Sequence, residues 1–235
     1  MKTAVITGAS SGIGQAVSRV FLDRGFQVLG IGRNFSTIAL NSPHFIPIVY
    51  DLTNTMGLEA LVKTLKSYGD IHCLVNSAGV GYYGLHETLN PRKLHEMVAV
   101  NLEAPLILSQ LLLRDLKQAR GYLFNISSVT ALHSSPHGCA YGATKAGLTS
   151  FGQSLFDEAR KYGLKVVTIH PDMTRSQFYR NADFMEGETE DTFLVPSEVA
   201  GAVEMALDAR EGLVLREITL QPQKHQIRKK PRNQL

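Results

Sequence analysis

The feature that most constrains the fold is the alternation of short apolar strands with amphipathic helices along the whole chain. Residues 3–7, TAVIT, read as a buried strand that stops at Gly8, and residues 14–25 read as a helix that ends at Gly25. Further strands are expected at 26–32, 44–53, 71–79, 122–128, 164–171 and 214–222, with helices at 57–69, 92–121, 141–163 and 197–209. This alternation is typical of a parallel sheet covered by helices on both faces, so we expect a doubly wound α/β fold of about seven strands.

The chain is long enough for one large domain. It has 235 residues, 44% of them hydrophobic, and no linker or repeat interrupts it. We therefore assign 1–223 to a single domain, in which 172–196 lacks a clean period and is expected to form a substrate loop or lid. Within the helices, Pro105 is expected to cause a kink, and Ser197 is expected to cap the helix that it begins.

The positive charge is concentrated at the end of the sequence. The last twelve residues, KHQIRKKPRNQL, hold five of the 24 Lys and Arg, and the rest of the chain is slightly acidic, with 19 basic residues against 21 acidic ones. We predict that 224–235 is a flexible basic tail and that the domain presents no basic face to nucleic acid.

Membrane insertion and disulfide bonding are also not expected. No apolar run reaches membrane-spanning length, and the opening residues are broken too soon by glycine to be a signal peptide. The two cysteines, Cys73 and Cys139, give no disulfide framework, so we expect a cytoplasmic protein.

A glycine-rich turn follows the first strand and opens the first helix. In TGASSGIG, residues 7–14, Gly8, Gly12 and Gly14 let the backbone turn tightly and approach a phosphate. The free N–H groups at the start of the helix can then bind that anion. The place of this turn between a strand and a helix favours nucleotide binding over an ordinary loop.

Four further motifs follow in a fixed order. They are NSAG at 76–79, Asn101, NISS ending at Ser128, and YGATK at 141–145. Together with TGASSGIG, this series resembles the short-chain dehydrogenase/reductase (SDR) family over residues 3 to about 205, nearly the whole chain. The resemblance implies a single Rossmann-like domain. It also implies hydride transfer between a nicotinamide dinucleotide and a small-molecule carbonyl or alcohol.

The resemblance also assigns catalytic roles. Tyr141 corresponds to the general acid/base, and Lys145, four residues on along the same helix face, is expected to lower its pKa from about 10. Ser128 is expected to hydrogen-bond the substrate oxygen, and Asn101 to kink the long helix and hold a water on the proton relay.

The cofactor is expected to be NADP rather than NAD. Similar NAD enzymes place an acid after the second strand, whereas this chain has Arg33, which can pair with a 2′-phosphate. Asp51 resembles the residue that contacts the adenine amine, although a helix cap is a competing role. Thr174 or Ser176 resembles the residue that bonds the nicotinamide amide. The complete set of expected cofactor residues is Gly8, Ser10, Ser11, Gly12, Ile13, Gly14, Arg33, Asp51, Leu52, Asn76, Ala78, Gly79, Tyr141, Lys145, Pro171, Thr174 and Ser176.

Three positions depart from the family pattern. Ser11 stands where many NADP-binding relatives have a basic residue, so the expectation of NADP rests on Arg33 alone. Ser77 stands where a second asparagine is frequent, and Asp172 replaces the glycine that usually follows Pro171. No metal site is expected, because His133, His137 and Cys139 have no convincing fourth ligand in the sequence.

Two alternatives stay open beside an NADP-dependent carbonyl reductase. One is a 3-oxoacyl-[acyl-carrier-protein] reductase, although the C-terminus lacks the glycine-rich ending of such enzymes. The other is a dinucleotide-binding sensor without turnover, although such proteins commonly lose the tyrosine or the lysine.

The sequence also predicts a homodimer, or a homotetramer, built through the two long helices. The prediction rests on the apolar run LILSQLLL at 106–113, together with Leu148, Phe151, Leu155 and Phe156.

Overall fold

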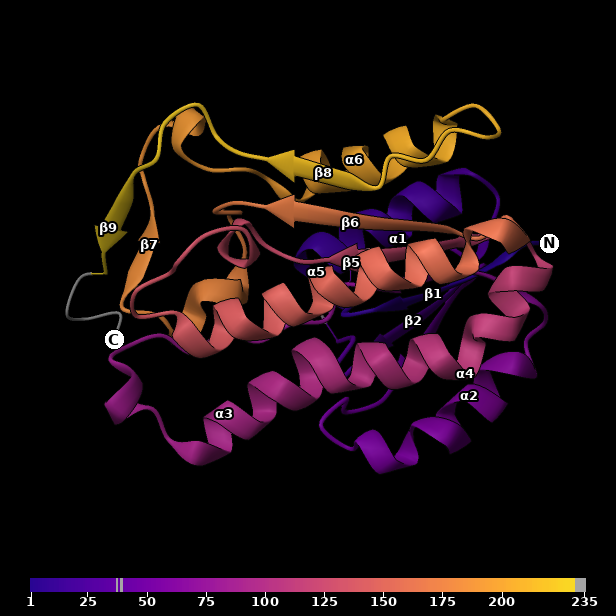
Figure 1. Ribbon diagram of the computed structural model, residues 1–235, viewed down its shortest axis with the longest axis horizontal. Helices are drawn as coiled ribbons and strands as arrows, with labels where there is room; N and C mark the ends of the chain where they lie inside the picture. Colours follow the sequence, from indigo (N-terminus) through magenta and orange to yellow (C-terminus); the bar gives the residue numbers. More distant parts are fainter. Residues whose placement is uncertain (37, 39, 231–235) are drawn as a thin grey trace.

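The computed structural model describes residues 1–36, 38 and 40–230, which form one α/β domain (Figure 1). The main sheet has seven strands, as predicted: β1 (Thr3–Thr7), β2 (Gln27–Gly32), β3 (Phe45–Val49), β4 (Ile71–Asn76), β5 (Tyr122–Ile126), β6 (Lys165–Pro171) and β8 (Glu217–Leu220). The helices are α1 (Gly12–Asp23), α2 (Leu58–Lys66), α3 (Pro91–Val98), α4 (Ala104–Gln118), α5 (Cys139–Ala159) and α6 (Pro196–Asp208).

The strand order creates a crevice for a ligand. The sheet runs β3-β2-β1-β4-β5-β6-β8, and every neighbouring pair is parallel. The chain moves outward in one direction from β1 to β3 and then crosses back to place β4 on the other side of β1. Ligands of open α/β sheets bind at such a switch point, beyond the carboxyl ends of the strands.

Alternate strand residues face two separate cores. Val5 points into the core shared with α2, α4 and α5, whereas its neighbours Ala4 and Ile6 point into the core shared with α1 and α6. Figure 1 shows these two helix layers on opposite faces of the sheet. The predicted doubly wound architecture is confirmed.

The long helical stretch is interrupted at Asn101, as the family resemblance implied, rather than at Pro105. A π-helical turn, Ala99–Glu103, separates α3 from α4, so the irregularity is centred on Asn101, and Pro105 already belongs to α4. The two are linked, because Pro105 has no N–H to give the carbonyl four residues before it, which is that of Asn101. By length and composition the run Pro91–Gln118 could cross a membrane. Half of its most apolar window is buried in the fold, as in the core helix of a soluble protein, so this run is only weak evidence for a membrane span.

The cap predicted for α6 is wrong by two residues. Pro196 occupies the first turn, and Val195 is the N-cap residue, whose backbone N–H donates to the Glu198 carboxylate at 2.8 Å. Proline is well suited to the first turn because it lacks the N–H that would be left unpaired there.

The C-terminal segment forms a second, small sheet with the lid. Strand β9 (Ile227–Lys229) pairs antiparallel with β7 (Phe184–Glu186), and Figure 1 shows the two side by side at one end of the molecule. The prediction that 224–235 is a flexible tail is therefore wrong for 224–230, whereas 231–235 lie outside the described residues. The lid also contains two short 3₁₀ turns, Gln177–Asn181 and Glu190–Thr192, which its irregular sequence did not reveal.

Candidate active site

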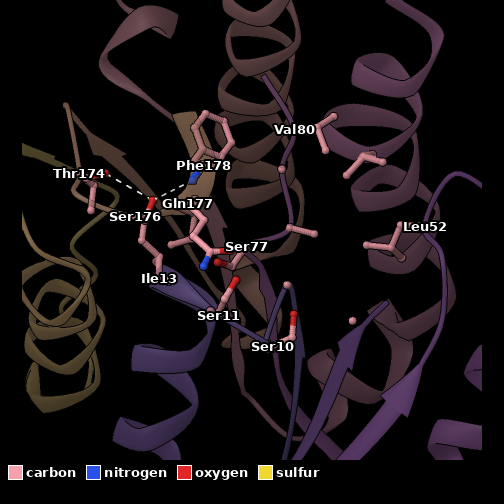
Figure 2. A pocket seen from close by; sticks show the side chains of 18 of the residues that line it. Ser10, Ser11, Ile13, Leu52, Ser77, Val80, Thr174, Ser176, Gln177 and Phe178 are labelled. Carbon is pink, nitrogen blue, oxygen red and sulfur yellow. Dashed lines mark hydrogen bonds between the residues drawn. The ribbon is translucent and has the colours of Figure 1, made fainter. Parts of the chain in front are cut away.

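A cavity of about 430 Å³ opens at the carboxyl ends of the strands. Almost all of the residues expected from the sequence line it: Gly8, Ser10, Ser11, Gly12, Ile13, Gly14, Arg33, Asp51, Leu52, Ala78, Gly79, Ser128, Tyr141, Lys145, Pro171, Thr174 and Ser176. Figure 2 shows side chains from the β1–α1 turn, the end of β4 and the lid converging on this space. Residues from seven separate stretches of sequence therefore share one cavity.

The β1–α1 turn is packed so closely that side chains would not fit. Gly8 has a φ of +70°, and a Cβ on it would lie 2.9 Å from the Cα of Ala78. A Cβ on Gly14 would lie 2.3 Å from the Gly8 carbonyl oxygen. Thr7 Oγ1 holds this arrangement by accepting hydrogen bonds from the backbone N–H groups of Ser77 and Ala78, both at 3.0 Å.

Helix α1 starts beside the cavity without a side-chain cap. Ser11 is the N-cap residue in an extended conformation, and its side chain makes no capping hydrogen bond. The first backbone N–H groups of the helix can therefore bind an anion. This turn and helix start fit the diphosphate of a dinucleotide.

Three candidate catalytic residues meet at the other part of the cavity. Tyr141 is buried and hydrogen-bonds the Ser128 side chain. Ser128 is itself fixed, because its hydroxyl accepts from the backbone N–H of Thr130 at 3.2 Å. The buried Lys145 ammonium donates to the Ile126 carbonyl at 2.8 Å and lies 5.8 Å from the centroid of the Tyr141 ring.

Burial dominates the electrostatics of this pair. It raises the pKa of Tyr141 well above its ordinary value, and the hydrogen bond with Ser128 lowers the pKa only in part. Burial also lowers the pKa of Lys145 to about 8. Burial therefore governs the pKa of Tyr141 here, where the Lys145 ammonium gives its hydrogen bond to a backbone carbonyl, and the lowering of that pKa by Lys145 stays a prediction.

Asn76 and Asn101 lie behind the cavity rather than in its wall. Asn76 is buried between the strands and donates to Asn125 Oδ1 at 2.9 Å. The Asn101 side chain accepts from Val80 N–H at 2.8 Å and donates to the Val80 carbonyl at 2.9 Å and to Thr144 Oγ1 at 3.1 Å. Asn101 therefore holds the loop after β4 that forms one wall, whereas Asn76 links β4 to β5.

The end of β2 presents Arg33 to the cavity. Its side chain is 53% exposed, and its guanidinium lies 3.9 Å from the Glu96 carboxylate, which also accepts from the Tyr82 hydroxyl at 2.7 Å. Asp51 lines the same region, and its carboxylate accepts from the N–H and hydroxyl of Thr53 at 3.0 and 2.9 Å. Asp51 caps no helix, because the N-cap residues of the next two helical segments are Asn54 and Gly57.

Part of the expected lid, Thr174 and residues 176–180, lines the cavity on the side of Tyr141. Ser176 caps the 3₁₀ turn Gln177–Asn181 by accepting from Phe178 N–H at 3.2 Å, and its hydroxyl donates to the Thr174 carbonyl at 3.4 Å (Figure 2). Sequence reasoning missed several residues that line the cavity: Ile31, Gly32, Asn34, Ser36, Tyr50, Ser77, Val80, Val100, Ile126, Ser127, Asp172, Gln177, Phe178, Tyr179 and Arg180. For Phe178 and Tyr179, the signal was only that they belong to the predicted lid.

Among the described residues, no group of three or more His, Cys, Asp or Glu side chains is placed to hold a metal ion. His133 contacts the neighbouring Ser134 carbonyl at 3.0 Å.

Known proteins resemble this chain over almost its full length. A family model described as short chain dehydrogenase matches residues 2–186. An uncharacterized oxidoreductase of Staphylococcus epidermidis is 32% identical over 228 residues, covering 94% of this chain and 97% of the relative. The structure of an alcohol dehydrogenase from the archaeon Thermococcus sibiricus, complexed with 5-hydroxy-NADP, is 25% identical with a TM-score of 0.86, covering 96% of this chain and 99% of that one.

A second similar structure shares the fold. It is a 4-hydroxyisoleucine dehydrogenase complexed with NADH and succinate, 24% identical with a TM-score of 0.81, covering 93% of this chain and 97% of that one. The family match spans the turn after β1, the cavity and the tyrosine helix. This chain belongs to the short-chain dehydrogenase family of oxidoreductases.

Proposed function

We propose that the protein is an NADP-dependent reductase of a small-molecule carbonyl compound, able to oxidise the corresponding alcohol in reverse. The observation that carries this proposal is that Ser128, Tyr141 and Lys145 share one cavity with the uncapped start of α1. A nicotinamide dinucleotide bound there supplies or accepts the hydride. Relatives of similar fold hold NADP or NADH, which supports a cofactor of this class.

The residues of the chain divide the remaining work. The hydroxyl of Tyr141 gives its proton to the carbonyl oxygen as the alcohol forms, and the hydroxyl of Ser128 hydrogen-bonds that oxygen. Lys145 provides a positive charge that stabilises the phenolate left behind. The Asn101 carbonyl lacks its ordinary α-helical partner, because Pro105 has no N–H to donate. This carbonyl can hold a water that returns the proton to Tyr141.

NADP preference is proposed from Arg33. Its guanidinium is half-exposed at the cavity edge and can pair with a 2′-phosphate. Glu96, 3.9 Å away, competes for the same charge. Asp51, Thr174 and Ser176 are proposed to hold the adenine and nicotinamide ends, as the family resemblance implies.

The test is a panel of ketones and aldehydes, followed by the absorbance of NADPH. Turnover of at least one carbonyl substrate supports the proposal. NADPH binding without turnover across the panel would favour a dinucleotide sensor. Turnover confined to acyl-carrier-protein substrates would favour a 3-oxoacyl reductase. A basic tail could attract an acidic carrier protein, but Lys224 and Arg228 in that tail pair with acids of the same chain.

We further propose a homodimer through α4 and α5, in a cytoplasmic protein. Leu148, Leu155 and Phe156 fill the core of the single chain, so they do not belong to the expected contact surface. A half-buried apolar face remains, made of Leu106, Ile107, Leu111, Leu113 and Phe151. Burial of that face in a two-fold contact would remove it from water.

A further inference from the structure

Four aromatic side chains pack around the proposed proton donor, Tyr141. The ring centroids of Tyr83 and Phe178 each lie 5.6 Å from that of Tyr141. Phe184 lies 4.9 Å from Tyr83 and 5.6 Å from Tyr179. We call these five residues the aromatic cluster. Phe178 and Tyr179 line the cavity, while Tyr83 and Phe184 pack behind them.

The aromatic cluster is poorly hydrated. Tyr141 is 6% exposed, the other four rings are half-buried, and burial raises the pKa of both Tyr83 and Tyr179 well above the ordinary value. A substrate whose oxygen reaches the Tyr141 hydroxyl must lie against these rings. An ionised group brought against them loses hydration that the rings do not replace.

The charged groups nearest to the aromatic cluster are already engaged or exposed. Lys145 donates to the Ile126 carbonyl at 2.8 Å. Asp172 accepts from the backbone N–H of Met173 at 2.8 Å and from the Gln221 amide at 3.2 Å, and its negative charge raises the pKa of Tyr179 further. The side chain of Arg180 lines the cavity but is exposed. The rings therefore favour an uncharged ligand.

The C-terminal segment, residues 224–230, holds the outer side of this cluster. Besides the β7–β9 pairing, Lys230 Nζ donates to the Tyr179 carbonyl at 2.7 Å and to the Arg180 carbonyl at 3.3 Å. The backbone N–H of Lys230 donates to the Asp183 carbonyl at 2.8 Å. Lys224 forms an ion pair with Asp191 at 2.7 Å.

Strand alternation separates two roles along β9. Arg228 and Lys230 point to the lid and are half-buried, and Arg228 pairs with Glu188 and donates to the Glu186 carbonyl at 3.1 Å. Lys229, between them, is exposed. The same segment thus offers both a positioning residue and its matched control.

We propose that the aromatic cluster is the substrate subsite, that it takes the uncharged, apolar end of a carbonyl compound, and that the C-terminal segment positions it over Tyr141. This proposal rests on the proposed reductase function, because it names the substrate class of the same site. Phe178 and Tyr179 form the wall that contacts the substrate, and Lys230 acts on them through the lid backbone.

Two ketones of opposite character test the substrate class. Acetophenone carries an uncharged ring, and pyruvate carries a carboxylate. With NADPH, kcat/KM for acetophenone should exceed that for pyruvate by about 100-fold, because the carboxylate would lose hydration against the rings and the charge of the exposed Arg180 is screened by water. An equal or higher value for pyruvate would overturn the proposal.

A binding readout separates this proposal from the proposed function. Acetophenone should raise the melting temperature of the Tyr141→Phe variant saturated with NADPH, and pyruvate should not. If that binding is seen but the unmutated protein reduces neither ketone, the subsite stands and the reductase function fails. If acetophenone neither binds nor reacts, the subsite assignment is wrong.

The positioning role is tested on the strand itself. Lys230→Met should raise the KM for acetophenone about tenfold while kcat and the Kd for NADPH change little, since the wall shifts but the catalytic group does not. Lys229→Met should leave all three values unchanged, and Lys230→Arg should restore part of the KM. The positioning role is refuted if Lys229→Met has as large an effect as Lys230→Met. It is also refuted if Lys230→Met does not raise the KM.

Discussion

Replacing Gly8 by alanine tests whether the β1–α1 turn is a ligand cradle or only a tight turn. Gly8 and Gly25 have almost the same backbone angle, φ +70° and +73°. Alanine at either position therefore carries the same left-handed strain, a net cost of about 1 kcal/mol after the gain in unfolded-state entropy is subtracted. The two positions differ in their surroundings. A Cβ on Gly8 would lie 2.9 Å from the Cα of Ala78, whereas nothing lies within 4 Å of a Cβ on Gly25.

The extra contact at Gly8 fixes the size of the expected effect. Ordinary contact begins at 3.4 Å, so the turn must move away from Ala78 by roughly half an ångström, and close-packed backbone does not absorb this locally. Gly25→Ala should lower the melting temperature by about 2–4 °C and leave NADPH binding intact. Gly8→Ala should also weaken the binding of NADPH by at least tenfold, or about 1.4 kcal/mol. Calorimetric titration and thermal melts measure both, and equal NADPH affinity for the two variants would refute the cradle.

Three further outcomes are expected. Arg33→Ala should weaken the binding of NADPH by about 1.5–3 kcal/mol more than the binding of NADH. Equal affinity of the unmutated protein for the two cofactors would exclude NADP preference. The pKa of Lys145 falls from 10.5 unfolded to about 8 folded, so the unfolded state binds more protons between these values and stability rises with pH. Relative to Lys145→Met, the unmutated protein should gain about 2 kcal/mol between pH 8 and 10 in urea unfolding, and parallel curves would contradict this. Sedimentation should show a dimer that Leu111→Glu converts to monomer; an unmutated monomer near 25.8 kDa would exclude the α4–α5 contact.

The sheet and most of the cavity could be predicted because their signals are local. Residues such as Val5 and Phe21 show their periodicity within a few positions, and TGASSGIG carries its own turn chemistry. Parallel strands then bring their carboxyl ends to one edge by topology. That is why Gly8, Ser128 and Pro171, far apart in the sequence, line one cavity as expected.

The lid could not be predicted because it depends on a long-range pairing. Strand β9 meets β7 more than 40 residues away, and a basic run such as IRKK has no local pattern that distinguishes it from a solvated tail. Arg228 and Lys230 became half-buried only through that pairing. The pairing also brings Arg228 to Glu188, so part of the basic charge is neutralised within the chain.

The burial of the Tyr141 phenol could not be predicted from the sequence for a related reason. The four-residue spacing to Lys145 is visible in the sequence, but the rings of Tyr83 and Phe178 that desolvate the phenol come from two other loops. Burial then raises the pKa that the ammonium was expected to lower.

The most direct test of the account is the rate of hydride transfer in Tyr141→Phe, measured as NADPH consumption with the best ketone of the panel. Removing the hydroxyl should lower kcat by at least about 100-fold and leave the Kd for NADPH within about threefold, because the group acts only in proton transfer. Tyr122→Phe, at the opposite end of β5 from the cavity, is the control and should keep its rate. A Tyr141→Phe variant that retains most of the unmutated rate would contradict the assignment of the proton donor.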